Sequence, residues 1–206
     1  MKVKVCGLTN AADAAFAAME GADYLGFVVH PPSPRHCADL AEATREVRDR
    51  AVLVTVADDA EIIMRMANSA GIGNIQPYVS REHRQTVIQR LKAEGYFILL
   101  PWIDERDRVA LTEDFHIWES NPDETGVAGG SGRTHPMAFP PPGPFLLAGG
   151  LDAENLWERA ALIPAEARLN LRGFDAASRL ERSPGIKDSV KVRAFIRTIR
   201  SMSIEA

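Results

Sequence analysis

The sequence predicts a closed barrel of eight parallel strands with helices outside, formed by all 206 residues as a single domain. Eight short apolar runs follow one another along the chain, and helix-forming segments separate most of them. Several of these runs are apolar almost throughout, which is typical of strands buried on both faces of a parallel sheet. No linker divides the chain and no repeat is evident. An open doubly wound sheet would show the same alternation and is the alternative fold.

The eight expected strands are short. They cover about residues 1–6, 22–29, 51–56, 74–77, 96–100, 115–118, 145–148 and 168–174. The chain is slightly smaller than the ~250 residues usual for this barrel, so short loops and helices are expected.

The expected helices alternate with these strands. They cover about residues 11–20, 40–48, 59–70, 81–94, 105–111 and 189–201, with one more that begins at Asp152. Asn10 caps the first, Asp58 or Asp59 caps the third, and Gly21 and Gly95 are typical helix ends.

Composition excludes several classes of partner. Apolar residues make up 46% of the chain and charged residues 25%, which is enough for a sizeable core. The net charge is −4 and no basic stripe stands out, so we expect no nucleic-acid partner. No apolar run approaches the ~20 residues that span a bilayer, and no signal peptide is recognisable, so we expect no membrane partner. The two cysteines, Cys6 and Cys37, then indicate a reducing cytoplasm.

Cys6 ends the first expected strand. Gly7 follows it, and Thr9-Asn10 begins the next helix. This places a thiol at the carboxyl end of a strand, where barrels of this class carry their chemistry. The alternative is that Cys6 is a buried packing residue, the commoner role of a free cysteine.

Two turns near the C-terminus are candidates for binding an anion. Gly149-Gly150 lies between an apolar strand and Asp152, and Ala177-Ser178 follows the eighth strand. Backbone N–H groups in such turns bind phosphate, and the loops after strands seven and eight often do so in these barrels. The long segment 119–144 is glycine-rich and then proline-rich, which favours a functional loop.

The motifs, taken in order, resemble the phosphoribosylanthranilate isomerase family of tryptophan biosynthesis. The segment Lys4-Val5-Cys6-Gly7-Leu8-Thr9 is similar to the family's first-strand motif. Further similar segments lie at residues 22–27, 33–35, 129–133, 147–151 and 181–188. The resemblance covers almost the whole chain.

The resemblance implies an isomerase of the aldose–ketose type. The family opens the ribose ring of phosphoribosylanthranilate to an aminoketose by an Amadori rearrangement, without a metal or organic cofactor. By resemblance, Cys6 is the base that takes the proton from the sugar C2, and a carboxylate after the sixth strand is the acid that protonates the ring oxygen. As a base, Cys6 needs a thiol pKa that falls towards neutrality.

The resemblance also implies how the substrate is bound. Arg35 matches the arginine that holds the anthranilate carboxylate. The phosphate is expected at Gly149-Gly150 and Ala177-Ser178, and Gly130 lies in a further matching glycine segment. The expected partner is a small phosphorylated molecule, bound by a monomer or homodimer.

Three positions depart from the family pattern. Glu119 stands where the family has its acidic aspartate, and the extra methylene displaces the carboxyl on a scale that can reduce rate ~10²-fold. Asp123 or Glu124 replaces it only if the loop folds back. Tyr78 stands in place of the histidine after the fourth strand, and Arg179 in place of a glycine in the phosphate turn. Arg179 there needs ordinary backbone geometry and adds a positive charge.

These departures leave two other functions open. One is a relative that acts on another phosphorylated aminosugar. The other is a non-catalytic protein that binds a phosphorylated metabolite.

Overall fold

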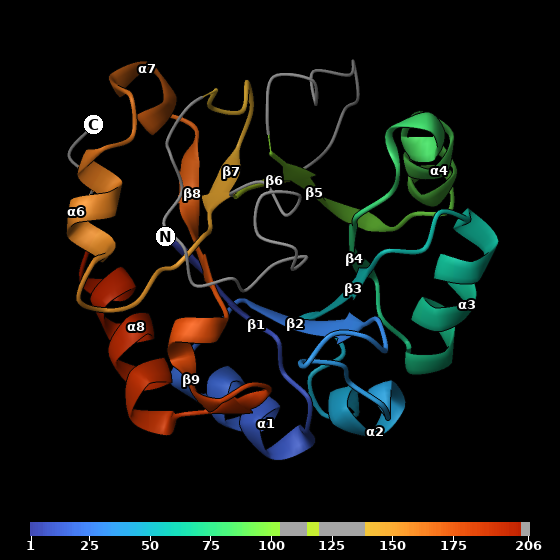
Figure 1. Ribbon diagram of the computed structural model, residues 1–206, viewed down its shortest axis with the longest axis horizontal. Helices are drawn as coiled ribbons and strands as arrows, with labels where there is room; N and C mark the ends of the chain where they lie inside the picture. The colour runs from blue at the N-terminus through green and yellow to red at the C-terminus, as the bar shows by residue number, and fades with distance from the viewer. Residues whose placement is uncertain (104–114, 120–138, 203–206) are drawn as a thin grey trace.

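A closed barrel of eight parallel strands forms the centre of the computed structural model, which describes residues 1–103, 115–119 and 139–202 (Figure 1). The strands are β1 (Lys2–Cys6), β2 (Tyr24–Val29), β3 (Ala51–Thr55), β4 (Asn74–Pro77), β5 (Phe97–Trp102), β6 (Phe115–Trp118), β7 (Phe145–Leu147) and β8 (Leu171–Ala176). Because β1 pairs with both β2 and β8, the sheet has no free edge. The predicted barrel is confirmed and the open sheet is wrong.

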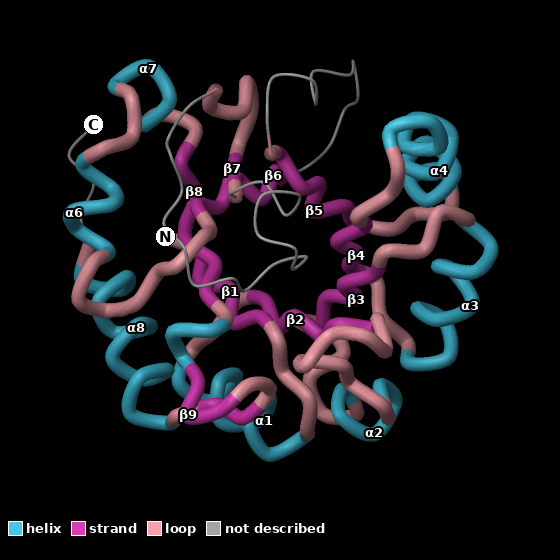
Figure 2. Tube along the Cα trace, viewed as in Figure 1, coloured by secondary structure: helices cyan, strands magenta, loops and turns pink. Residues whose placement is uncertain are grey.

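Helices surround the strands, as Figure 2 shows. They are α1 (Ala11–Glu20), α2 (Leu40–Thr44), α3 (Ala60–Ala70), α4 (Arg81–Ala93), α6 (Leu156–Ala161), α7 (Ala165–Arg168) and α8 (Ser189–Ser201). The side chain of Asn10 caps α1, and that of Asp59, not Asp58, caps α3. Gly21 ends α1 with a φ of 105°, a left-handed conformation that favours glycine. The helix expected at 105–111 lies outside the described residues.

Several boundaries differ from the prediction. The helix after β7 begins at Leu156 rather than at Asp152, because the Asp152 carboxylate holds an earlier turn by accepting from the backbone N–H groups of Glu154 and Asn155. The eighth strand begins at Leu171 rather than 168, because α7 continues through Arg168. The second helix is shorter than expected.

The turn after β8 contains structure that the sequence did not predict. It forms a 3₁₀ helix, η2 (Ser178–Leu180), and then a hairpin of β9 (Glu181–Ser183) and β10 (Ile186–Lys187). This hairpin lies close to α1 in Figure 1.

The core has two parts. One packs the outward faces of the strands against the helices, and the other fills the barrel with Val52, Val54, Leu99, Ile117, Leu146 and Ala148. At the amino ends of β2, β5 and β6, Tyr24, Phe97 and Phe115 contact one another. Successive side chains of a strand point alternately inward and outward. The inward-pointing residues that follow along each strand therefore lie nearer its carboxyl end. No helix in the described ranges is long and apolar enough to cross a membrane.

Candidate active site

Cys6 lies on the inner face of β1 at its carboxyl end, as the sequence predicted. Its register partner on β2 is Gly26, and a Cβ added at Gly26 would lie 2.6 Å from the Cys6 Sγ. The missing side chain at Gly26 therefore provides the space that the thiol occupies. Cys6 and Cys37 are both free cysteines, and Cys37 is buried in the outer core.

A buried ion pair lies one layer below the thiol. The Lys4 side chain is fully buried, and its Nζ donates to Oδ2 of Asp175 at 2.9 Å. The two residues are register partners on β1 and β8, so closure of the barrel brings them together. Burial alone would lower the pKa of Lys4, but Asp175 and Cys6 outweigh it and raise that pKa, so Lys4 carries a positive charge.

The thiol of Cys6 does not have the lowered pKa that the sequence led us to expect. Burial raises the pKa of Cys6 above its ordinary value, and Asp175 adds to this effect. The ammonium groups of Lys4 and Lys187 act in the opposite direction and lower it. The two ammonium groups therefore stabilise the thiolate form of Cys6, which burial disfavours.

Glu119 and Tyr78 meet inside the barrel. The Tyr78 hydroxyl donates to Oε1 of Glu119 at 2.5 Å, and the Gln76 Nε2 donates to the Tyr78 oxygen at 2.9 Å. Strand β5 separates β4 from β6, so side chains that follow these two strands meet only through the interior. Glu119 is 7% exposed. Burial and the Glu119 carboxylate together raise the pKa of Tyr78 well above its ordinary value, which keeps the phenol neutral.

The Arg35 side chain lies beside Gly7, the residue that follows Cys6 in the chain. A Cβ added at Gly7, whose φ is 73°, would lie 2.7 Å from the Arg35 Cδ. The Arg35 guanidinium makes a two-point ion pair with Glu181 through Nε and Nη2, both at 2.8 Å. Lys187 Nζ donates to the same carboxylate at 2.9 Å. The hairpin after β8 therefore orients Arg35.

The two turns expected to bind phosphate lie next to each other. Gly149 and Gly150 have φ values of 96° and 62°, so both need the freedom of glycine. Arg179 is not among the residues with positive φ and has the ordinary backbone geometry that was expected of it. Its Nη1 donates to Oδ2 of Asp152 at 2.7 Å, which joins the turn after β8 to the turn after β7. Gly130, Asp123 and Glu124 lie outside the described residues.

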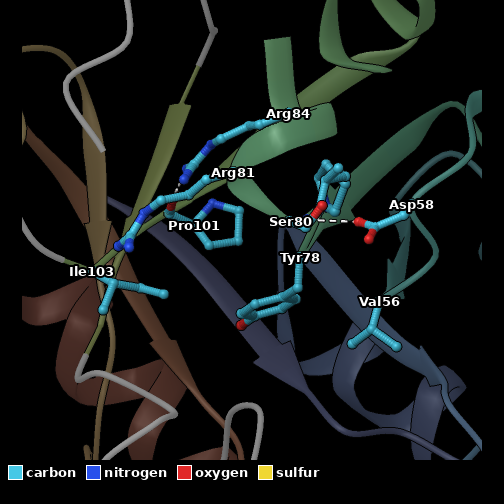
Figure 3. Close-up of a pocket in the computed structure, with 10 residues that line it drawn as sticks. Val56, Asp58, Tyr78, Ser80, Arg81, Arg84, Pro101 and Ile103 are labelled. Carbon is cyan, nitrogen blue, oxygen red and sulfur yellow. Dashed lines mark hydrogen bonds between the residues drawn. The ribbon is translucent and has the colours of Figure 1, made fainter. Parts of the chain in front are cut away.

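A cavity of about 350 Å³ opens beside Tyr78 (Figure 3). Its lining residues lie at or beyond the carboxyl ends of three neighbouring strands, β3, β4 and β5. Asp58 accepts from the backbone N–H of Ser80 on one side, and Arg84 donates to the carbonyl of Pro101 on the other. Tyr78 is among the residues that line this cavity, whereas Cys6 and Glu119 are not.

Sequence reasoning missed three polar groups of this interior, Lys4, Gln76 and Asp175. A signal for the first was present, because a lysine two residues before Cys6 in a strand points to the same face as the cysteine. Asp175 lies on β8 as the register partner of Lys4. Its Oδ1 is buried and makes no hydrogen bond within the described ranges.

Comparison with known proteins identifies the family. The family model "N-(5'phosphoribosyl)anthranilate (PRA) isomerase" matches residues 123–198. The N-(5'-phosphoribosyl)anthranilate isomerase of Azorhizobium caulinodans is 31% identical, over 98% of this chain and 92% of that protein. The chain belongs to the phosphoribosylanthranilate isomerase family.

Other members of the phosphoribosylanthranilate isomerase family agree in length and fold. The isomerase of a Geobacter species is 31% identical, over 98% of this chain and 99% of that protein. The crystal structure of the Thermus thermophilus enzyme has a TM-score of 0.74 and 27% identity, over 98% of this chain and 99% of that chain. The predicted family and barrel are both confirmed.

Proposed function

We propose that this protein catalyses the Amadori rearrangement of N-(5-phosphoribosyl)anthranilate to the carboxyphenylamino-deoxyribulose phosphate, a step of tryptophan biosynthesis. The observation that carries the proposal is that a thiol and a carboxyl group both lie near Tyr78 inside the barrel. Glu119, after β6, accepts a hydrogen bond from the Tyr78 hydroxyl at 2.5 Å, and Cys6, at the end of β1, acts on the same phenol. The reaction needs one base and one acid, and the barrel interior holds a candidate for each.

The proposed steps divide the proton transfers between these two groups. Glu119 donates a proton to the ring oxygen as the bond from that oxygen to C1 breaks, and the nitrogen lone pair forms an iminium. Cys6 as thiolate then removes the proton from C2, and the electron pair of the C–H bond neutralises the iminium to give an enol-amine. Return of the proton from Cys6 to C1, with loss of the C2 hydroxyl proton to water, gives the aminoketose, and Glu119 regains its proton from water. The steps involve no net oxidation and use no cofactor.

The proposed binding groups surround the thiol and the carboxyl group. Gly149, Gly150, Ala177 and Ser178 bind the phosphate through backbone N–H groups, with the positive charge of Arg179 beside them. Gly130, outside the described residues, is proposed to contact the substrate from the long loop.

Arg35 is proposed to bind the anthranilate carboxylate. Its Nε and Nη2 are occupied by Glu181, whereas its Nη1 makes no hydrogen bond within the described part of the chain. A guanidinium held at one edge can present its other edge to a carboxylate.

The decisive test is turnover of phosphoribosylanthranilate by the purified protein, with Cys6→Ser as the variant and Cys37→Ser as its matched control. Loss of the base is expected to reduce kcat by about 10²–10⁴-fold, the usual contribution of general acid–base catalysis. Cys37→Ser, in the outer core, is expected to retain the parent kcat. Full activity in Cys6→Ser would exclude Cys6 as the base, and a folded parent without turnover would exclude the proposed reaction.

A second candidate function is the same chemistry on another phosphorylated aminosugar. The hydrogen-bonded pair of Tyr78 and Glu119 favours it, because both residues depart from the family pattern and they contact each other. A panel of phosphorylated aminosugars, assayed beside phosphoribosylanthranilate, decides between the two functions by the ratio of kcat/KM values.

We propose that the protein is cytoplasmic and is a monomer or a homodimer. Light scattering of the purified protein would distinguish the monomer from the dimer.

A further inference from the structure

We propose that Tyr78 is a positioning residue for Glu119: together with Gln76 it holds the carboxyl group inside the barrel and sets the pH at which that group ionises. Its catalytic consequence rests on the proposed function, but the coupling between Tyr78 and Glu119 does not.

The hydrogen bonds among Gln76, Tyr78 and Glu119 all donate towards the Glu119 carboxylate. The Gln76 amide nitrogen is a donor only, so at 2.9 Å the Tyr78 oxygen must accept from it. The phenol proton is then directed to Glu119 Oε1, 2.5 Å away. A distance this short is typical of a bond between a hydroxyl and an ionised carboxylate. The three side chains therefore form a chain of donors that ends on Glu119.

The carboxyl group lies among other charged and titratable groups. Cys6 on β1 and Asp175 on β8 act on Tyr78 as Glu119 does, and Lys4 on β1 is paired with Asp175. Arg81 and Arg84 of α4 line the cavity beside Tyr78. Asp175 and a Cys6 thiolate oppose ionisation of Glu119, whereas the hydrogen bond that Tyr78 donates favours it.

Two positions that depart from the family pattern thus contact each other directly. The longer side chain of Glu119 has additional rotamers, and a hydrogen bond selects among them. Tyr78 donates this bond from the opposite side of β5.

The test is Tyr78→Phe, which removes the hydroxyl and keeps the ring. Tyr96→Phe is the matched control, because the Tyr96 hydroxyl donates to Oδ1 of Asn68 in an exposed pair outside the barrel. Glutamate labelled with ¹³C at the carboxyl carbon reports each titration by NMR, and Glu119→Gln assigns the signal. Loss of the donated hydrogen bond is expected to raise the ionisation midpoint of Glu119 by about one pH unit in Tyr78→Phe and to leave it unchanged in Tyr96→Phe.

The kinetic consequence has a definite sign. A carboxyl group ordinarily titrates well below a thiol, and burial raises the pKa of Cys6 further, so the acidic limb of the kcat/KM profile follows Glu119 and the alkaline limb follows Cys6. Raising the midpoint of Glu119 therefore moves the acidic limb to higher pH, and loss of position lowers kcat about tenfold with KM little changed. The alkaline limb is expected to move less.

The outcomes separate this proposal from the proposed function. An unchanged Glu119 midpoint in folded Tyr78→Phe would overturn the coupling. A shifted midpoint with an unchanged kcat would overturn the positioning role. A parent protein without isomerase activity would overturn the proposed function, while the NMR titration would still decide the coupling. If Tyr78→Phe fails to fold, Gln76→Leu, which removes the donor to the phenol, is titrated in its place with the same expectation of a raised midpoint.

Discussion

Lys4 is a charged residue in the middle of an apolar strand, and the structure pairs its charge inside the barrel. A lysine in the middle of a buried strand would be very costly without a partner, and Asp175 supplies one. The pair also places a fixed positive charge next to Cys6. Lys4 is therefore expected to control the ionisation of the thiol.

Substitution Lys4→Met tests this control, because methionine keeps most of the volume and removes the charge. Lys4 lowers the pKa of Cys6, so its loss is expected to raise that pKa and move the pH profile of alkylation by iodoacetamide to higher pH. The measurement uses a Cys37→Ser background so that only Cys6 reacts.

Removal of Lys4 also leaves Asp175 without its partner. The double variant Lys4→Met, Asp175→Asn controls for this uncompensated buried charge. The same alkylation profile in the parent and in both variants would show that Lys4 has no influence on the thiol.

Glu181, in the short strand β9, binds a side chain from a distant part of the sequence. It begins β9, and its carboxylate binds both Arg35, from the loop after β2, and Lys187 on β10. All three side chains are buried or nearly so. The hairpin thus anchors the second loop of the barrel to the eighth.

Substitution Glu181→Gln is expected to reduce the free energy of unfolding by about 3 kcal/mol, since it leaves two buried cations without a carboxylate. Urea unfolding measures this change. Glu42→Gln is the matched control, because Glu42 forms only an exposed pair with Arg45 and little change is expected there. Equal effects of the two substitutions would mean that the buried cluster contributes no more than a surface pair.

The helix and strand boundaries show where local chemistry is sufficient. Asn10 and Gly21 act on their own helix as the sequence predicted, and of the two candidates Asp58 and Asp59 it is Asp59 that caps α3. Asp152 has the residue type of a cap but instead holds a turn, because Asn155 stands closer to the helix. The β9–β10 hairpin was not predictable, because its strands are held by contacts with Arg35 and other distant residues.

The pairing of β8 with β1, which closes the barrel, brings the two backbones very close together at Gly173. At Gly173 on β8, an added Cβ would lie 1.9 Å from the carbonyl oxygen of Lys2 on β1. The neighbour is backbone, so it cannot move without opening the pairing between β8 and β1. The glycine is therefore required for the sheet to close.

Substitution Gly173→Ala is expected to lower the free energy of unfolding by at least about 2 kcal/mol, or to prevent folding, because the added methyl group overlaps the backbone. Thermal unfolding followed by circular dichroism measures the change. Gly73→Ala is the control, since a Cβ there would meet nothing within 4 Å. A parent-like melting temperature for Gly173→Ala would show that β8 and β1 do not pack this closely.

The sequence by itself determined the eight strands of the barrel, the helices after most of them, and the place of Cys6 at the carboxyl end of the first strand. These features depend on residues near one another in the chain: the period of apolar residues, the caps and the glycines. The family followed from the same motifs in order.

Only the tertiary structure decided which side chains meet. Tyr78 and Glu119 are 41 residues apart, Arg35 and Glu181 are 146 apart, and Lys4 and Asp175 are 171 apart. Strand register and barrel closure create each pair, and neither can be read from a local pattern. The same is true of the pKa of Cys6, because burial is a property of the assembled barrel and here it outweighs the nearby lysines.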